Sequence, residues 1–353
     1  MTTEQILRPG RDDEPPRQRR RGVRGLVIVL GVVLVLVLLL AGGIFFVTQK
    51  LGDQVGRYPG VFTGLDDANR PAATASQTFL LMGTDSRSAD PTTGSDASAP
   101  DFVFGQQRSD AIMLATVAPG GTGGSVVSIP RDSYVDIPGH GMNKINAAYS
   151  FGGPTLLIAT VEQLTRIRVD HFAVIDFAGF QQMVDAAGGI DITIPQSTSD
   201  MRSEFAAGPQ HLDGTQALNY VRQRYNLPGG DFDRVRRQQN ALRALVRSAL
   251  SSGTLSSPTR AYDLVNSLTQ HIGVDDSLSN TGLATLAFSL RDLRNENIKF
   301  LTAPYAGTGM EGDQSVVYLD RTADDDLWFA VNNDQVAQWV STRPQASLPE
   351  APR

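Results

Sequence analysis

Residues 171–194 read HFAVIDFAGFQQMVDAAGGIDITI, and this stretch decides the predicted fold. The apolar run at 171–177 has the composition of a buried strand, and residues 178–187 are expected to form a helix. Glycines at 188 and 189 end that helix, because glycine readily takes the left-handed conformation that closes helices. Residues 190–194 then predict a second strand. Strands and helices in alternation indicate an α/β or α+β arrangement.

Further strands and helices are expected on both sides of this stretch. Short apolar runs predict strands at 78–82, 111–117 and 125–129, and the glycine-rich turn at 120–124 joins the last two as a hairpin. One more strand is expected in NIKFLTAP near the end of the chain. The expected helices are 154–164, with Pro154 at its first position, 213–219, 233–250 and 261–293. The predicted fold class is therefore α/β with an α+β-like character, a mixed central sheet flanked by helices.

The composition excludes several classes of protein. The chain has 353 residues and a formal net charge of −6 at pH 7, which argues against nucleic acid as a partner. It contains no cysteine, so disulfide scaffolds, cysteine-bound metal centres and thiol catalysis are excluded. Of the 31 basic residues, three are lysines (Lys50, Lys144 and Lys299) and the other 28 are arginines. An acidic chain that prefers arginine so strongly needs a chemical explanation.

The amino terminus has the pattern of a single membrane anchor. Residues 1–25 hold seven arginines against four acidic residues and are expected to be a disordered, basic cytoplasmic tail. Residues 26–47 carry no charge and, as a helix, are long enough to cross the roughly 30 Å hydrocarbon core of a membrane. The basic flank places the amino terminus in the cytoplasm. A cleaved signal peptide is the alternative. Signal peptides have a shorter apolar region that ends in a small-x-small site, whereas the run at 26–47 is longer and ends in Phe45, Phe46 and Val47.

The rest of the chain divides into three expected parts. Residues 48–76 have little pattern and are expected to form a juxtamembrane linker. Residues 77–340 are expected to form one extracytoplasmic catalytic domain, and the proline-rich tail 341–353 is expected to be frayed. The predicted protein therefore lies in the cell membrane, crosses it once and has its catalytic domain outside.

Charged residues gather at the ends of the predicted strands. Asp85 follows the first strand, and Arg108 and Asp110 begin the second. Arg131 and Asp132 close the third. These strand ends would meet at one sheet edge, the usual place of an α/β site, and Arg108 and Asp110 would point to the same face. No zinc spacing of the histidines, G-x-S-x-G elbow or Walker A loop offers another site.

The densest charged segment is YVRQRYNLPGGDFDRVRRQQ at 220–239. Arg222 and Arg224 share a face if the chain is extended there, and Asp231 or Asp233 could cap the following helix. One face of that helix is expected to carry donors suited to a multiply charged oxyanion such as pyrophosphate. These donors are Arg234, Arg237 and Gln238. The alternative is an ordinary solvated face. That alternative is the expectation for Arg236, Arg243 and Arg247.

The chain resembles the LytR–CpsA–Psr family of membrane-anchored cell-envelope enzymes in segments that occur in order. They are LLMGTDSR, RSDAIMLATV, VSIPRDSYVDIPG, KINAAYSFGG, VDHFAVIDFAGFQQMVDAAGGIDI, HLDGTQALNYVRQRY and GGDFDRVRRQQ, with SVVYLDRTADDDLWFAV near the end. The resemblance implies transfer of a glycan polymer from a polyprenyl-pyrophosphate carrier to peptidoglycan or another wall acceptor.

The resemblance also implies roles for single residues. Asp85 and Asp110 correspond to the residues that hold a magnesium or manganese ion. The apolar core between the sheet and the helices corresponds to the site of the lipid tail. The counterparts of the pyrophosphate ligands are Arg108, Arg131, Arg222, Arg224, Arg234 and Gln238. Arg237 is grouped with them as a candidate, and Asp231 and Asp132 have no assigned role.

Two features depart from the family pattern. The loop 86–107 is longer than usual, which leaves open how a substrate would reach the pocket. Asp233 stands where glycine is common, and it would add either a negative charge near the phosphates or a second helix cap.

The residues and the resemblance predict the same mechanism. A divalent cation and arginines, with Arg222 and Arg224 as candidate catalytic groups, would neutralise the diphosphate while an acceptor hydroxyl attacks one phosphorus. Asp85 or Asp110 would take the proton. Two alternatives stay open. One is a lipid-pyrophosphate phosphatase, and the other is a non-enzymatic regulator or scaffold, although the short cytoplasmic tail offers no helix-turn-helix.

Overall fold

The computed structural model describes residues 55–84, 109–201, 203–223, 226–249, 265–266, 269–289 and 295–352. These residues belong to one compact unit, 48–353. Within these ranges, no helix is both long and apolar enough to cross a membrane. The basic tail, the anchor at 26–47 and the loop 86–107 lie outside the described residues, so what the sequence indicates for them stays a prediction.

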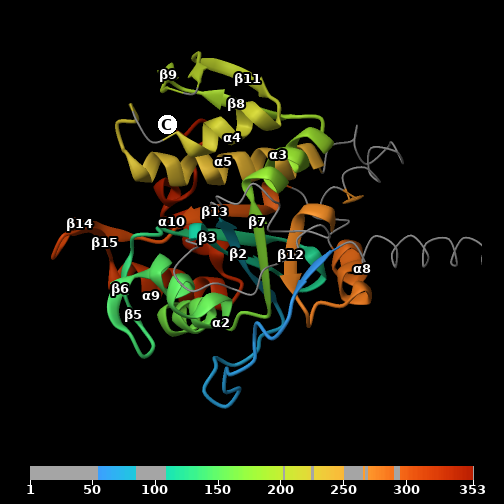
Figure 1. The fold of residues 1–353 in the computed structure, drawn as a ribbon, viewed down its shortest axis with the longest axis vertical. Helices are drawn as coiled ribbons and strands as arrows, with labels where there is room; N and C mark the ends of the chain where they lie inside the picture. The colour runs from blue at the N-terminus through green and yellow to red at the C-terminus, as the bar shows by residue number, and fades with distance from the viewer. Residues whose placement is uncertain are drawn as a thin grey trace, which may run out of the picture. The chain divides into compact units, whose positions relative to one another are not determined.

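A seven-stranded mixed sheet forms the centre of the described fold, as the sequence predicts (Figure 1). Its strands are β1 (Gly56–Tyr58), β2 (Gln77–Thr84), β3 (Ser109–Val117), β4 (Gly124–Ile129), β7 (His171–Asp176), β12 (Ile272–Asp275) and β13 (Ile298–Thr302). Their spatial order is β1-β12-β7-β2-β3-β4-β13. The pairs β2–β3, β3–β4 and β7–β12 are antiparallel, and the other three pairs are parallel.

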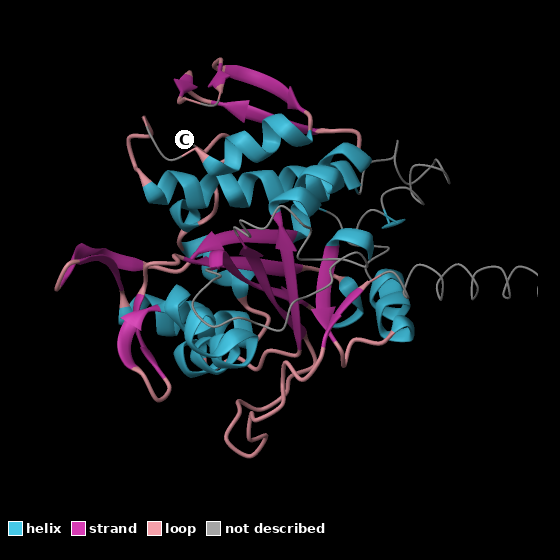
Figure 2. Ribbon diagram, in the orientation of Figure 1, coloured by secondary structure: helices cyan, strands magenta, loops and turns pink. Residues whose placement is uncertain are grey.

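Helices cover both faces of this sheet (Figure 2). Along β3, Ile112 and Leu114 belong to a core with α2 (Ile145–Thr165), α9 (Arg321–Asn332) and α10 (Val336–Thr342). Met113 between them belongs to a second cluster, against which Leu242 of α5 (Asp231–Ala249) packs. This alternation follows because neighbouring residues of a strand point to opposite faces. Further helices of the described residues include α3 (Phe177–Ala186), α4 (Gly214–Arg222) and α8 (Asn280–Ser289).

Two-stranded sheets surround this framework. They pair β5 (Tyr134–Ile137) with β6 (Gly141–Lys144), β8 (Ile190–Ile194) with β11 (Gly208–Leu212), β9 (Thr198–Ser199) with β10 (Glu204–Phe205), and β14 (Tyr305–Glu311) with β15 (Gln314–Leu319). Short 3-10 turns are η1 (Pro119–Gly121), η3 (Asn295–Asn297) and η4 (Pro344–Ala346). The predicted strand at 190–194 is therefore present as β8, but it lies outside the central sheet. Its residues alternate between buried and exposed, as in a strand with one covered face.

Two predicted helices differ from the structure. α2 begins at Ile145, and Gly152 and Gly153 interrupt it with non-helical backbone before Pro154 starts its second part. The prediction of a helix at 154–164 is right for the second part of α2 and misses the first part, which begins at Ile145. The prediction of one helical region over 261–293 is wrong at β12, which is a strand held by β1 and β7. Local periodicity does not report such distant pairing.

Both ends of the described chain are more ordered than the sequence indicates. β1 lies in the predicted linker, and Val55 and Val61 beside it are buried. The tail is packed rather than frayed, because the Leu348 N–H donates to the Phe300 carbonyl at 2.9 Å. Arg243 is buried and donates to carbonyl groups of this tail, so the expectation of a solvated face is wrong for Arg243.

Candidate functional site at the sheet edge

The predicted strand ends meet at one edge of the sheet. β2, β4, β7 and β13 run in one direction and β3 runs in the other. Thr84 at the end of β2 pairs with Ser109 at the start of β3 and with Asp176 at the end of β7. Arg131 and Asp132 follow β4 at the same edge. The pairing therefore confirms the predicted meeting of these strand ends.

Asp110 occupies a β-bulge at this edge. Gly83 pairs with Ala111 while Thr84 pairs with Ser109, so Asp110 is an extra residue in β3. A bulge breaks the regular alternation of side chains and often re-aims a residue beside an active site. The same-face prediction for Arg108 and Asp110 assumed a regular strand, and the bulge removes that basis. Arg108 and Asp85 lie outside the described residues, and for Asp110 the backbone alone is described.

Five charged side chains of alternating sign lie in a row beside the sheet edge. The Lys144 Nζ atom lies 3.3 Å from Asp132 Oδ1, and Asp132 Oδ2 lies 3.8 Å from Arg131 Nε. Arg131 Nε lies 4.0 Å from Asp231 Oδ2, and Asp231 Oδ1 lies 2.6 Å from Arg234 Nη2. We call these five residues the charge chain. Its three cations outnumber its two carboxylates, and the start of α5 adds a positive dipole, so the row favours an anion.

Backbone hydrogen bonds from the start of α2 position the segment that carries Arg131 and Asp132 of the charge chain. The Ile145 N–H donates to the Ser133 carbonyl at 2.8 Å, and the Asn146 N–H donates to the Arg131 carbonyl at 3.1 Å. Lys144, the residue before this helix, was not selected as a site residue from the sequence. The sequence feature that points to Lys144 is its rarity, because it is one of three lysines in a chain whose other basic residues are arginines.

Asp233 closes the loop that leads into α5. It is buried, and its Oδ2 atom accepts a hydrogen bond of 2.7 Å from the Gly229 N–H. Its Oδ1 atom lies 3.2 Å from Arg236 Nη1. Asp233 therefore stabilises the loop before α5, and its bond goes to Gly229 rather than to a backbone N–H of the first helical turn.

Arg237 does not join Arg234 and Gln238. Its side chain is 1% exposed and donates to Gln223 Oε1 at 2.5 Å and to Thr198 Oγ1 at 3.0 Å. The guanidinium carbon also lies 4.7 Å from the centre of the Tyr220 ring. A step of one residue turns about 100° around a helix, so Arg237 and Gln238 point in different directions. Arg237 therefore links α5 to α4 and β9, and the prediction that it binds pyrophosphate is corrected accordingly.

Arg222 lies beside an aromatic ring at the end of α4. Its guanidinium carbon is 4.6 Å from the centre of the Phe177 ring, a cation–π contact. Phe177 also lines an apolar pocket, so Arg222 is near that pocket. Gln223, the next residue, is extended, and Arg224 lies outside the described residues.

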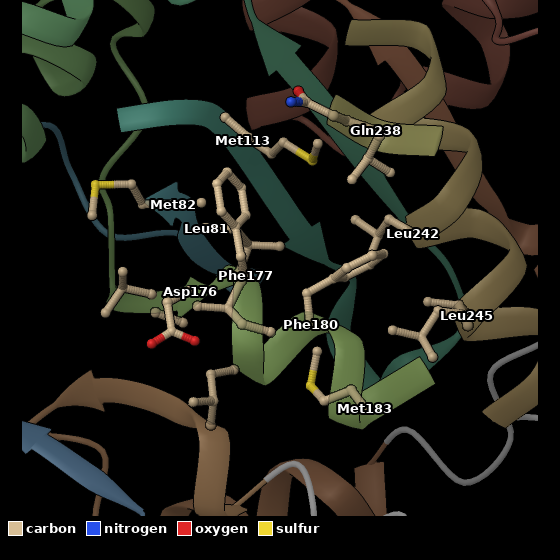
Figure 3. Close-up of a pocket in the computed structure, with 18 of the residues that line it drawn as sticks. Leu81, Met82, Met113, Asp176, Phe177, Phe180, Met183, Gln238, Leu242 and Leu245 are labelled. Carbon is tan, nitrogen blue, oxygen red and sulfur yellow. The ribbon is translucent and has the colours of Figure 1, made fainter. Parts of the chain in front are cut away.

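The apolar pocket has a volume of about 340 Å³ and lies between the sheet and helices α3 and α5 (Figure 3). β2, β3, β7 and β12 contribute its sheet side. Labelled side chains around it include Leu81, Met113, Phe180, Met183 and Leu242. Gln238 also lines it, one helical turn after Arg234 of the charge chain. An apolar pocket thus occupies the region predicted for a lipid tail, and α5 connects it to the charged edge.

The charge chain and the apolar pocket together define a class of α/β domain that is suited to an amphiphile, a molecule with an anionic head and an apolar tail. The LytR_cpsA_psr family model matches residues 61–332. The chain therefore belongs to the LytR_cpsA_psr family.

Named relatives and a solved structure agree with this membership. The cell wall biosynthesis protein LcpA of Corynebacterium glutamicum is 34% identical over 83% of this chain and 62% of LcpA, so the chain spans less than two thirds of that relative. A polyisoprenyl-teichoic acid–peptidoglycan teichoic acid transferase TagU of Oceanobacillus iheyensis is 32% identical over 91% of this chain and 93% of TagU. The crystal structure of B. subtilis TagV has a TM-score of 0.59 and 25% identity, and covers 75% of this chain and 99% of TagV.

Proposed function

We propose that the protein transfers a glycan polymer from a polyprenyl-pyrophosphate carrier to peptidoglycan or another wall acceptor and forms a phosphodiester. The observation that carries the proposal is the charge chain beside the apolar pocket, because an anionic head and a lipid tail need these two environments together. The name of the TagU relative, a polyisoprenyl-teichoic acid–peptidoglycan teichoic acid transferase, supports the same class of reaction.

In this proposal, arginines bind the diphosphate oxygens, since planar guanidinium groups pair with phosphate in a bidentate manner. Arg131 and Arg234 do so from the charge chain, and Asp231 between them orients both groups. Arg222, Arg224 and Arg108 complete the phosphate contacts that the family resemblance implies. Gln238 lies where the charged edge meets the apolar pocket.

A magnesium or manganese ion, held by Asp85 and Asp110, is part of the proposal. Both aspartates are sequence neighbours of the paired residues Thr84 and Ser109, so this end of the β2–β3 pair supports the role. Among the residues that the structure describes, no group of three or more His, Cys, Asp or Glu could hold a metal ion. Magnesium commonly uses one or two carboxylates together with substrate phosphates. Such an ion supplies Lewis-acid polarisation of the diphosphate.

The reaction joins the acceptor hydroxyl oxygen to the phosphorus that carries the glycan. The bond from that phosphorus to the bridging oxygen breaks, and polyprenyl phosphate leaves with the bonding electrons. Asp85 or Asp110 takes the hydroxyl proton. Arg131 and Arg234 stabilise the negative charge that develops on the bridging and leaving oxygens.

The proposal includes a location in the cell membrane. Residues 26–47 would cross the membrane once, with the amino terminus in the cytoplasm and the catalytic domain outside. The uncharged run behind a basic tail supports this arrangement. An anchor of this kind also keeps the domain at the membrane surface, where a polyprenyl carrier resides.

Purified full-length protein, a polyprenyl-pyrophosphate glycan, magnesium and peptidoglycan fragments test the proposal. We expect mass spectrometry to find glycan joined to peptidoglycan through a phosphodiester when the acceptor is present. Arg234→Gln should lower the rate about 100-fold, as removal of one donor to a transition-state oxyanion does, while Arg247→Gln on the exposed side of α5 should not. Free phosphorylated glycan with or without acceptor would identify a phosphatase instead, and binding without turnover would identify a scaffold.

A further inference from the structure

A second cavity, of about 710 Å³, lies on another face of α5, and the proposed reaction does not use it. Its walls come from the start of α5, the residues around the end of β13, and the tail segment 344–351. Arg243 holds this tail through hydrogen bonds of 3.2 Å to the Leu348 carbonyl and 2.9 Å to the carbonyls of Pro349 and Glu350. The volume lies in the range of roughly 300–1,000 Å³ that small-molecule sites occupy.

Gln239 brings a buried acceptor to this cavity. Its side chain is 1% exposed, and its Nε2 atom donates to the Leu301 carbonyl. Its Oε1 atom accepts no hydrogen bond from the part of the chain that the structure describes. Because buried polar atoms are nearly always paired in folded proteins, this oxygen indicates a ligand that donates a hydrogen bond at the cavity wall.

Two aromatic rings line the same cavity. The rings of Phe232 and Tyr305 are stacked, with centres 4.1 Å apart and planes inclined by 13°. Tyr305 is 39% exposed, so part of its ring is available to a ligand. Aromatic rings offer a flat apolar surface, on which the C–H face of a pyranose ring packs. Arg236, also at the cavity wall, adds N–H donors for ring hydroxyl groups.

The cavity lies next to the proposed phosphate site. Phe232 directly follows Asp231 of the charge chain, and Thr302 ends β13 at the sheet edge that Arg131 also occupies. The apolar pocket uses a different line of α5 residues, which includes Gln238 and Leu242. A ligand in the second cavity would therefore be near the diphosphate and separate from the lipid tail.

We propose that this second cavity binds a sugar ring of one of the two glycan substrates. Gln239 accepts a hydrogen bond from a ring hydroxyl, Tyr305 packs against the ring face, and Arg236 donates to a further hydroxyl. A neutral, hydroxyl-rich pyranose is the ligand class that uses an acceptor, a donor and an aromatic surface together. The inference rests on the proposed transferase activity and adds a glycan subsite to it.

The test compares Tyr305→Ala and Gln239→Leu with the wild-type full-length protein. Met310→Ala is the matched control, because it removes an exposed side chain from the same strand, outside the cavity. Steady-state rates with a polyprenyl-pyrophosphate glycan as donor and a peptidoglycan chain as acceptor give a KM for each substrate. We expect one KM to rise about threefold to tenfold in both variants, the effect of losing one contact, with kcat nearly unchanged. A higher acceptor KM assigns the ring to the acceptor, and a higher donor KM assigns it to the donor.

Unchanged KM values in both variants, with wild-type transfer intact, would overturn the subsite and leave the transferase proposal in place. Absence of transfer by the wild-type protein would contradict the transferase proposal instead. Calorimetry with the soluble glycan portions of donor and acceptor then decides the subsite without turnover. Weaker binding of either glycan by Tyr305→Ala than by Met310→Ala supports the subsite, and equal binding of both glycans by the two variants overturns it.

Discussion

Asp231 and Arg234 are one turn apart on α5, and the Asp231 Oδ1 atom lies 2.6 Å from the Arg234 Nη2 atom. The other oxygen of Asp231 lies 4.0 Å from Arg131 Nε. One carboxylate therefore stands between two guanidinium groups that would otherwise repel each other. Both arginines are thus held near one another before a phosphate binds, and such preorganised charge is the arrangement that stabilises a transition state.

Asp231→Asn should therefore impair transfer more than folding. The amide keeps an acceptor oxygen but removes the negative charge that holds Arg131 and Arg234 together. We expect kcat/KM for the donor to fall about tenfold to hundredfold, as for loss of one carboxylate from a partly buried ion pair. Asp325→Asn, an exposed substitution on α9, is the control. Tighter binding of the donor by Asp231→Asn would contradict this role and show that the carboxylate competes with phosphate.

Arg237→Met should destabilise the fold. Burial lowers the pKa of the Arg237 guanidinium from its ordinary value, and the group is nevertheless bonded to Gln223 and Thr198. Methionine fills similar space but leaves both partners unpaired, so we expect urea unfolding to show a loss of about 2–4 kcal/mol in the free energy of unfolding.

Arg247→Met is the matched control, because Arg247 is another arginine of α5 and its ion pair with Glu350 is exposed on both sides. It should cost less than about 1 kcal/mol. If Arg237→Met kept wild-type stability and raised the donor KM, Arg237 would contact the diphosphate after all.

The strands that carry the charged edge could be predicted from the sequence because their signals are local. β2, β3 and β4 are apolar runs bounded by glycine or charged residues, and the aspartates and arginines at their ends could be read directly. The bulge at Asp110 could not be predicted in this way. It depends on the register between Thr84 and Ser109, which the hydrophobic pattern of one strand does not contain.

Residues positioned by distant parts of the chain were the ones that sequence reasoning placed wrongly or missed. β12 is a strand through its pairing with β1, where Gly273 lies opposite Gly56. The direction of Arg237 follows from α4 packing on its side of α5, and helical spacing alone did not reveal this. Lys144 reaches Asp132 from β6. In each case the environment is set by tertiary contacts, which override local propensity.

Asp324→Asn should change how stability depends on pH. Asp324 is 2% exposed, and its carboxylate oxygens accept no hydrogen bond from the described residues. Burial raises the pKa of Asp324 from 3.8 to about 7. The folded protein therefore keeps a proton that the unfolded chain loses, so stability from this group is complete below about pH 4 and is lost as the pH rises to about 7.

Asparagine does not ionise, so the Asn variant does not lose stability in this way as the pH rises from about 4 to about 7. The free energy of unfolding of the variant should therefore exceed that of the wild type by a margin that grows over this pH range. The margin should grow by about 1.4 kcal/mol per pH unit. Urea unfolding at several pH values measures it, with Asp313→Asn, an exposed substitution away from Asp324, as the control. Parallel pH profiles for Asp324→Asn and the wild type would show that Asp324 ionises normally in the folded protein.

Leu242→Trp should shorten the lipid that the apolar pocket accepts. Leu242 lines the pocket of about 340 Å³ between α5 and the sheet, and the larger ring would fill part of it (Figure 3). Each buried methylene contributes about 0.8 kcal/mol, so wild-type protein should bind donors more tightly as their polyprenyl chains lengthen, until the pocket is full. The variant should lose most of this gain and keep a nearly normal KM for short-chain donors.

A series of donors with increasing chain length, assayed for KM, distinguishes a filled pocket from a general disturbance. Phe329→Trp is the control, because Phe329 is exposed on α9. If Leu242→Trp raised the KM equally for short and long chains, the substitution would be acting on the charged edge. The pocket would then have no part in selecting the lipid, since a site for the tail must weaken long chains more than short ones.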